Sequence, residues 1–90
     1  MKVKFFATYR DVTRRKDEDV PVPPDVWALL ESLCERYPGL KSKLMTPGGA
    51  DIGDETIILV NGRNVCHLDG KNTQLAQTDT VSIFPVVAGG

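Results

Sequence analysis

The last six residues of the sequence, Pro85 to Gly90, are the segment whose residue types best suit chemistry. They carry no charged or hydroxyl side chain, and side-chain size falls from Val87 through Ala88 to Gly89 and Gly90. Because glycine lacks a Cβ, an enzyme could close tightly around this backbone and reach the free α-carboxylate. Adenylation would convert that carboxylate into an acyl electrophile. We expect Gly90 to carry the reactive group and Val87, Ala88 and Gly89 to thread a narrow channel; the alternative is a frayed terminus.

The other candidate reactive side chains favour structural roles. His67 is the only histidine and has no second ligand at metal-site spacing, so we expect no metal. Cys34 falls on the apolar stripe of an expected helix and is expected to be a buried, inert thiol, whereas Cys66 lies where an edge strand could expose it. Gly48-Gly49 belongs to a loop and forms no phosphate-binding motif. We therefore expect no bound cofactor.

Size and charge exclude several classes of function. Ninety residues make one small domain, too small for a deep active site of its own, so a partner must supply most of any site. The net charge of −1 does not favour nucleic acid, and the basic run at 14–16 is followed at once by acids at 17–19. No apolar run approaches the roughly 20 residues of a membrane helix. Two cysteines cannot build a disulfide framework, and a cytoplasmic location is the simplest expectation.

The first half of the chain predicts two strands and a helix. Residues 2–10 alternate with a period of two, which predicts a strand with Val3, Phe5, Ala7 and Tyr9 on the core face. Residues 19–22 predict a short second strand, placed at an edge because Pro21 cannot donate to a ladder. From residue 26 the apolar spacing changes to that of an amphipathic helix, which ends before residues 38–39, Pro-Gly.

The second half predicts one short helical turn and three further strands. The turn is expected within residues 40–45, and residues 46–54 are expected to form a loop. The apolar run 56–60 predicts a strand buried on both faces, Asn61-Gly62 a hairpin turn, residues 64–67 its return arm, and 81–84 the last strand. This order predicts an α+β, ubiquitin-like β-grasp fold: a mixed sheet with its first and last strands parallel and one main helix on one face. The alternative, a ferredoxin-like sandwich, lacks a second full helix.

The sheet face opposite the helix is expected to carry a partner surface. Phe6 alternates with Val3 and Phe5, and Phe84 and Val86 alternate with the core positions of the last strand. If the two strands are neighbours, Phe6, Phe84 and Val86 share one bare face beside the tail. An apolar patch in this position is typical of a docking surface. We assign residues 1–84 to the folded domain and residues 85–90 to a flexible tail.

Four segments resemble the MoaD family of ubiquitin-like sulfur carriers, the small subunits of molybdopterin synthase. They are the opening Val3-Lys4-Phe5-Phe6-Ala7 with Arg10, the pair Tyr37-Pro38, the turn Val60-Asn61-Gly62 and the closing Phe84-Pro85-Val86-Val87-Ala88-Gly89-Gly90. The resemblance spans nearly the whole chain.

The resemblance implies that a MoeB-like, E1-like enzyme adenylates the Gly90 carboxylate with ATP and that sulfur then replaces one oxygen, giving a thiocarboxylate. It further implies that the tail enters a MoaE-like large subunit, with Phe6, Arg10, Phe84 and Val86 on the partner surface. Arg10 matches an arginine at the end of the family's first strand.

The sequence departs from the family in two places. Val86 stands where the family commonly has a second proline, and the 46–54 loop is longer than in compact members. Long loops also occur in archaeal ubiquitin-like modifiers, which end in Gly-Gly and can be conjugated to lysines. Carriers resembling ThiS share the fold and the tail. A protein modifier and a sulfur carrier for another pathway, such as thiamine synthesis, tRNA thiolation or cysteine synthesis, are therefore the alternatives.

Overall fold

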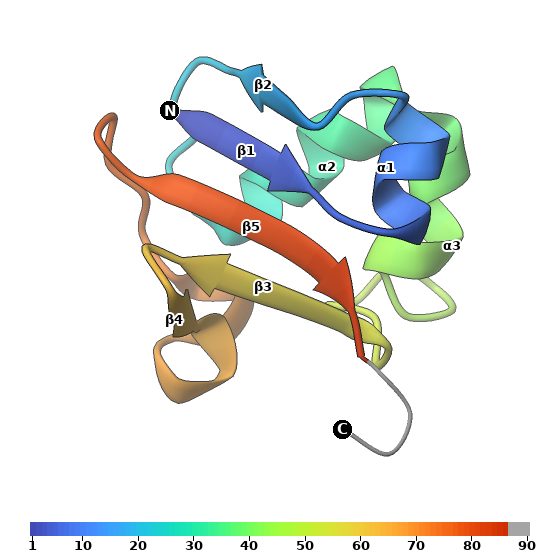
Figure 1. Ribbon diagram of the computed structural model, residues 1–90. Helices are drawn as coiled ribbons and strands as arrows, with labels where there is room; N and C mark the ends of the chain where they lie inside the picture. The colour runs from blue at the N-terminus through green and yellow to red at the C-terminus, as the bar shows by residue number, and fades with distance from the viewer. Residues whose placement is uncertain (87–90) are drawn as a thin grey trace.

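The computed structural model describes residues 1–86, which form a five-stranded mixed sheet (Figure 1). The strands lie in the order β2-β1-β5-β3-β4, where β1 is Lys2–Phe5, β2 Asp17–Asp19, β3 Thr56–Val60, β4 Arg63–Asn64 and β5 Thr80–Pro85. The first strand, β1, and the last, β5, are parallel neighbours in the middle, and both β1–β2 and β3–β5 are antiparallel. This is the predicted ubiquitin-like β-grasp topology.

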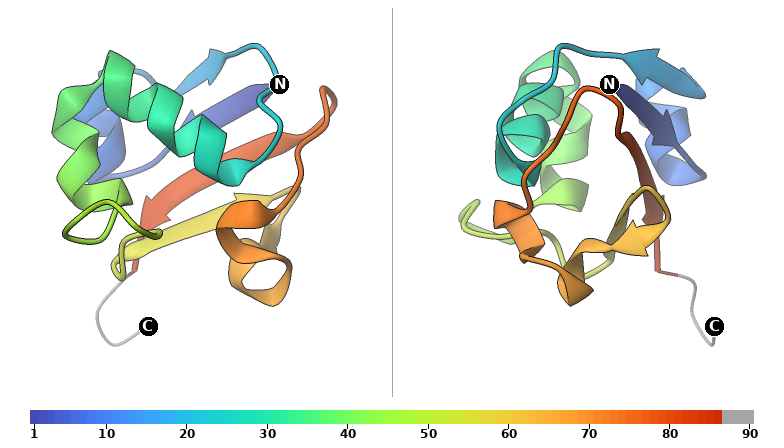
Figure 2. Two further views of the ribbon diagram at one scale, coloured as in Figure 1. Left: turned by 180° about the vertical axis from the view of Figure 1, so that it is seen from behind. Right: turned by 90° about the vertical axis from the view of Figure 1, so that its left-hand side faces the viewer.

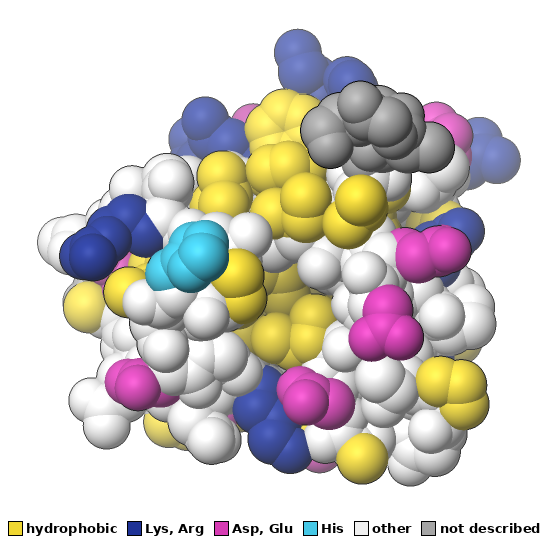
Figure 3. Space-filling model, turned by 90° about the horizontal axis from the view of Figure 1, so that it is seen from below, with side chains coloured by type: hydrophobic (Ala, Val, Ile, Leu, Met, Phe, Trp, Pro, Cys, Tyr) yellow, Lys and Arg dark blue, Asp and Glu magenta, His cyan; other side chains and the backbone are white. Residues whose placement is uncertain are grey.

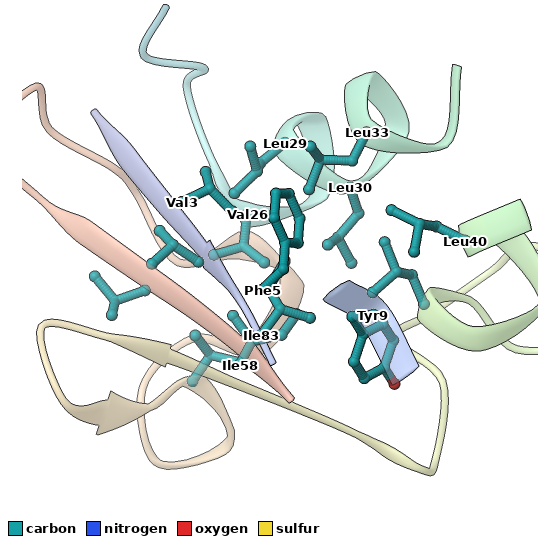
Figure 4. Packing of buried hydrophobic residues seen from close by; sticks show 14 of the residues in the cluster. Val3, Phe5, Tyr9, Val26, Leu29, Leu30, Leu33, Leu40, Ile58 and Ile83 are labelled. Carbon is teal, nitrogen blue, oxygen red and sulfur yellow. The ribbon is translucent and has the colours of Figure 1, made fainter. Parts of the chain in front are cut away.

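The main helix, α2 (Val26–Arg36), packs on one face of the sheet, and no helix of residues 1–86 covers the other face (Figure 2). Its first turn is capped by Asp25, whose carboxylate accepts a hydrogen bond from the Ala28 N–H at 2.8 Å. The short helix α3 (Lys41–Leu44) is the turn expected within residues 40–45, and the 3-10 helix η1 (Pro38–Leu40), which was not predicted, joins it to α2. The core lies between α2 and the sheet (Figure 4) and includes Val3, Phe5, Val26, Leu29, Leu30, Leu33, Leu40, Ile58, Val81 and Ile83.

The prediction of one strand over residues 2–10 was wrong after Phe5. The chain turns at Ala7 and forms the helix α1 (Thr8–Thr13), so Arg10 lies on a helix and not at a strand end. Ala7 has φ 51° and ψ −126°, the values of the first central residue of a type II′ turn, a position that favours glycine. Tyr9 still faces the core, but it reaches the core from α1 and not from β1.

Replacing Ala7 with glycine is expected to stabilise the protein by up to about 1 kcal/mol. Glycine relieves the strain of a positive φ, and this gain exceeds its greater backbone entropy in the unfolded chain. Urea denaturation gives the free energy of unfolding. The matched control is Ala28→Gly, inside α2, which should destabilise by about 1 kcal/mol. Equal losses for both variants would show that the turn at Ala7 carries no strain.

Three smaller expectations also needed correction. The second strand covers Asp17–Asp19, two residues earlier than predicted, although it is an edge strand as expected. The Asn61-Gly62 hairpin is confirmed, with both residues at positive φ, but the return arm β4 ends at Asn64. There the Asn64 side chain accepts from the Cys66 N–H and starts the 3-10 helix η2 (Val65–His67). Strand β3 is only half-buried on its helix-free face.

A buried carboxylate joins edge strand β2 to the end of α2. The Glu18 side chain is 5% exposed, and its Oε1 accepts from the Arg36 guanidinium and from the Tyr37 hydroxyl. Its other oxygen, Oε2, is buried and has no hydrogen-bond partner among the described residues. Arg15 lies farther away, with its Nε 3.8 Å from Oε1. Arg36 is therefore the main charge that compensates Glu18.

Replacing Arg36 with methionine is expected to destabilise the protein by about 2 kcal/mol. Removing one partner of a fully buried ion pair costs about 3–5 kcal/mol, and the partial exposure of Arg36 reduces that figure. Glu18→Gln in the same chain should recover most of the loss, because it removes the uncompensated charge. Arg15→Met, the matched control, should cost less than about 0.5 kcal/mol. If the double variant were no more stable than Arg36→Met alone, the uncompensated charge on Glu18 would not be the cause of the loss.

Candidate functional site

An exposed apolar surface covers the helix-free face of the sheet where β5 ends. It is lined by Phe6, Ala7, Leu59, Ser82, Phe84 and Pro85, which together we call the apolar patch. The rings of Phe6 and Phe84 pack edge to face, with centroids 5.9 Å apart and planes at 85°. Phe6 is 42% exposed, far more than any aromatic residue of the core. Figure 3 shows hydrophobic side chains gathered on this side of the molecule.

The parallel pairing of β1 and β5 brings the two phenylalanines together. Phe5 pairs with Ile83, and the Phe6 N–H donates to the Ile83 carbonyl at 3.1 Å, so Phe6 continues the ladder past the end of β1. Phe6 and Phe84 both alternate with core residues and therefore share the opposite face, as predicted. Leu59 joins them because β3 pairs with the other side of β5. The sequence interpretation missed Leu59, because it expected β3 to be buried on both faces.

The chain leaves the sheet next to this patch. Pro85 is the last residue of β5 and pairs with Thr56, and the N–H of the half-exposed Val86 donates to the Glu55 carbonyl at 2.9 Å. The sheet therefore holds the chain through Val86. The predictions for Val87, Ala88, Gly89 and Gly90 fall outside the described residues.

Two part-buried hydrogen bonds hold the segment from which the chain leaves the sheet. The Tyr9 hydroxyl lies 2.5 Å from Thr56 Oγ1, and this hydroxyl in turn donates to the Lys43 carbonyl. Burial raises the pKa of Tyr9, so its hydroxyl keeps its proton further into the alkaline range than an exposed tyrosine does. These hydrogen bonds link α1 to β3 and β3 to α3. They meet at Thr56, the residue that pairs with Pro85 at the end of β5.

Arg10 lies beside the apolar patch and has cationic neighbours. A second depression, which we call the basic groove, is lined by Lys4, Phe5, Phe6, Arg10, Lys16 and Asp17. Phe6 belongs to both surfaces and forms the wall between them. The sequence interpretation named Arg10 and Phe6 as partner-surface residues but not Lys4 or Lys16. Lys4 shares the face of Phe6 by the alternation of β1, whereas Lys16 is brought there by the β1–β2 pairing.

The remaining candidates lie apart from this site. Cys34 lies on α2 but is only half-buried, less than the buried position expected of it, while Cys66 and His67 are exposed on η2. Residues 1–86 contain no group of three histidine, cysteine or acidic side chains that could hold a metal ion. Within the same residues, no helix has the length and apolar character needed to cross a membrane.

The two cysteines should differ in reactivity. Burial raises the pKa of Cys34, so at pH 8 less of it is the reactive thiolate, and its half-buried position also slows access. Iodoacetamide followed by peptide mass analysis should show Cys66 alkylated about ten-fold faster. The Cys34 rate should keep rising with pH beyond the ordinary thiol range. A Cys66→Ala variant should retain only the slow phase, and equal rates for the two thiols would contradict the prediction.

Comparison with known proteins agrees with the fold. A family model described as the ThiS family matches residues 3–90. The chain is 41% identical over 92 residues to small archaeal modifier protein 3 of Haloferax volcanii, covering 100% of this chain and 98% of the relative. It is 30% identical over 89 residues to the molybdopterin synthase sulfur carrier subunit of Emericella nidulans, covering 99% and 96%.

Among solved structures, small archaeal modifier protein 1 of Methanosarcina acetivorans superimposes with a TM-score of 0.86 at 34% identity. The match covers 99% of this chain and 94% of that protein. The family model and both curated relatives extend over nearly the whole chain, tail included. The chain therefore belongs to the ThiS family of ubiquitin-like sulfur carriers.

Proposed function

We propose that this protein carries sulfur as a thiocarboxylate on Gly90, the last residue of its sequence. The observation that carries the proposal is the apolar patch, which lies where the chain leaves the sheet toward a segment ending in two glycines. A partner that docks on Phe6 and Phe84 would be positioned to receive the four residues that follow Val86, residues 87–90. Because those residues have small, uncharged side chains, they suit a narrow channel in that partner.

The chemistry needs an activating enzyme that uses ATP. In the first step a Gly90 carboxylate oxygen attacks the α-phosphorus of ATP, pyrophosphate leaves, and an acyl adenylate forms. In the second step a hydrosulfide-level donor attacks the acyl carbon, AMP leaves with the bonding pair, and the thiocarboxylate remains. The partner supplies the ATP site and the catalytic groups, while this chain supplies the acyl group and the docking surface.

We propose molybdopterin synthesis as the recipient pathway, with a MoeB-like activating enzyme and a MoaE-like large subunit as partners. The relative from Emericella nidulans is named as a molybdopterin synthase sulfur carrier subunit and is similar along nearly its whole length. Phe6, Arg10, Phe84 and Val86 are then the residues that contact these partners. We further propose a cytoplasmic site of action, where ATP and reduced sulfur donors are present.

A second candidate function is protein modification. The relative from Haloferax volcanii and the structure from Methanosarcina acetivorans are both named as small archaeal modifier proteins. The same acyl adenylate would then be attacked by a lysine ε-amine, forming an isopeptide bond and releasing AMP. Tryptic mass spectrometry of cell lysate would show this outcome as branched peptides joined through Gly90.

The test of sulfur transfer is intact-mass analysis. The full-length protein is incubated with the activating enzyme of its own organism, ATP and a sulfide donor. The expected result is a mass gain equal to the replacement of one oxygen by sulfur, dependent on ATP and reversed by hydrolysis. A second sulfur carrier from the same organism serves as the positive control. If the enzyme adds sulfur to that carrier but leaves this protein unchanged, the proposal is refuted.

A further inference from the structure

The basic groove stands out against the overall charge of the protein. The whole chain has a net charge of −1, yet Lys4, Arg10 and Lys16 converge on one depression that contains a single acid, Asp17. All three cationic side chains are exposed. The ion pairs found among residues 1–86 join Glu18 to Arg15 and Arg36, and so include none of these three.

Three different elements hold the cations in place. Lys4 lies on the helix-free face of β1, opposite Asp17 of β2. Lys16 precedes β2, and its carbonyl accepts from the Phe5 N–H at 2.8 Å, which fixes it beside the end of β1. The turn at Ala7 brings α1, and with it Arg10, to the same place. The groove is thus set by the backbone of the fold.

The groove cannot be separated from the apolar patch, because Phe6 lines both. A protein that buries Phe6 also removes water from the neighbouring cations. Desolvating a cation without an opposite charge is costly, so such a partner must bring anions of its own. Asp17 offsets one of the three positive charges and leaves an excess of two. This excess is best matched by two negative charges, which in a protein partner are carboxylates.

We propose that Lys4, Arg10 and Lys16 bind two or more carboxylates on the activating enzyme as it docks on the apolar patch, an inference that rests on the proposed function. Opposite charges at the edge of an apolar interface accelerate encounter and set register, and their effect weakens as salt increases. The groove thus selects an acidic segment of the enzyme, in addition to the apolar contact made by Phe6 and Phe84.

The test compares two double charge reversals of equal net change. Arg10→Glu with Lys16→Glu reverses the groove, and Lys41→Glu with Arg63→Glu reverses two exposed cations outside it. The activation rate is measured against carrier concentration at low and high salt, and circular dichroism checks the fold of each variant. We expect the groove variant to raise KM by about ten-fold or more at low salt and to lose most of its salt dependence. The control should stay within about two-fold of wild type.

The outcomes separate this inference from the proposed function. Wild-type protein that gains no sulfur refutes the proposed function. Wild-type protein that is activated normally, with both double variants shifted equally or neither shifted, refutes the acidic-partner inference alone. Retention of an RNA or DNA oligonucleotide by wild type but not by the groove variant, at physiological salt, would assign the groove to nucleic acid and would also refute it.

Discussion

Deleting Gly90 is expected to leave the protein folded but to lower the rate of its activation by at least about a hundred-fold. The deletion makes Gly89 the last residue and shortens the maximum reach of the tail by roughly 3.5 Å. The sheet holds the chain through Val86, by the hydrogen bond from its N–H to the Glu55 carbonyl, so a docked domain cannot simply slide to restore the lost reach. A displacement of even 1 Å from a reactive geometry can cost about a hundred-fold in rate.

Variants of the last residue separate reach from steric fit. Gly90→Ala keeps the carboxylate at its original distance and adds only a Cβ, so it should be impaired less than the deletion if reach dominates. One glycine added after Gly90 should be impaired as the deletion is. All three should keep the wild-type unfolding free energy, because the described core ends before them. Activation of the deletion variant at the wild-type rate would mean that the terminal carboxylate is not the reactive group.

The sequence was sufficient for the fold wherever local pattern and tertiary packing agree. The apolar stripe of α2 and the Asn61-Gly62 turn were predictable because each depends on its own residues. The pairing of β1 with β5 followed from topology, since parallel neighbours need a crossover. That pairing alone was enough to place Phe6 and Phe84 on one face.

The errors arise where one residue redirects the chain. No glycine or proline interrupts residues 2–10, so the alternation looks like one long strand, while Ala7 adopts a turn conformation that alanine rarely takes. Asn64 similarly ends β4 by capping η2 with its side chain. The basic groove could not be predicted for a different reason: Lys4, Arg10 and Lys16 belong to three different segments, the strand β1, the helix α1 and the loop before β2. The turn at Ala7 and the β1–β2 pairing bring these segments together.

Replacing both Phe6 and Phe84 with alanine is expected to weaken binding of the activating enzyme by about a hundred-fold or more. Large aromatic side chains at the centre of an interface commonly contribute about 2 kcal/mol or more each. The two rings pack against each other in the free protein, so removal of one ring also leaves the other less well placed. The losses of binding free energy in the two single variants should therefore sum to more than the loss in the double variant. Isothermal titration calorimetry against the enzyme measures all three.

The fold should tolerate these changes, because neither ring belongs to the buried core. Val22 provides the matched control, because it is as exposed as Phe6 and lies outside the apolar patch. Val22→Ala should bind as wild type does. If the double variant also bound as wild type, the partner would have to recognise the carrier through the basic groove and the tail alone. In that case the variant Arg10→Glu with Lys16→Glu would lose more affinity than the variant that lacks both rings. Comparing these two losses of affinity therefore decides whether apolar contact or charge dominates docking.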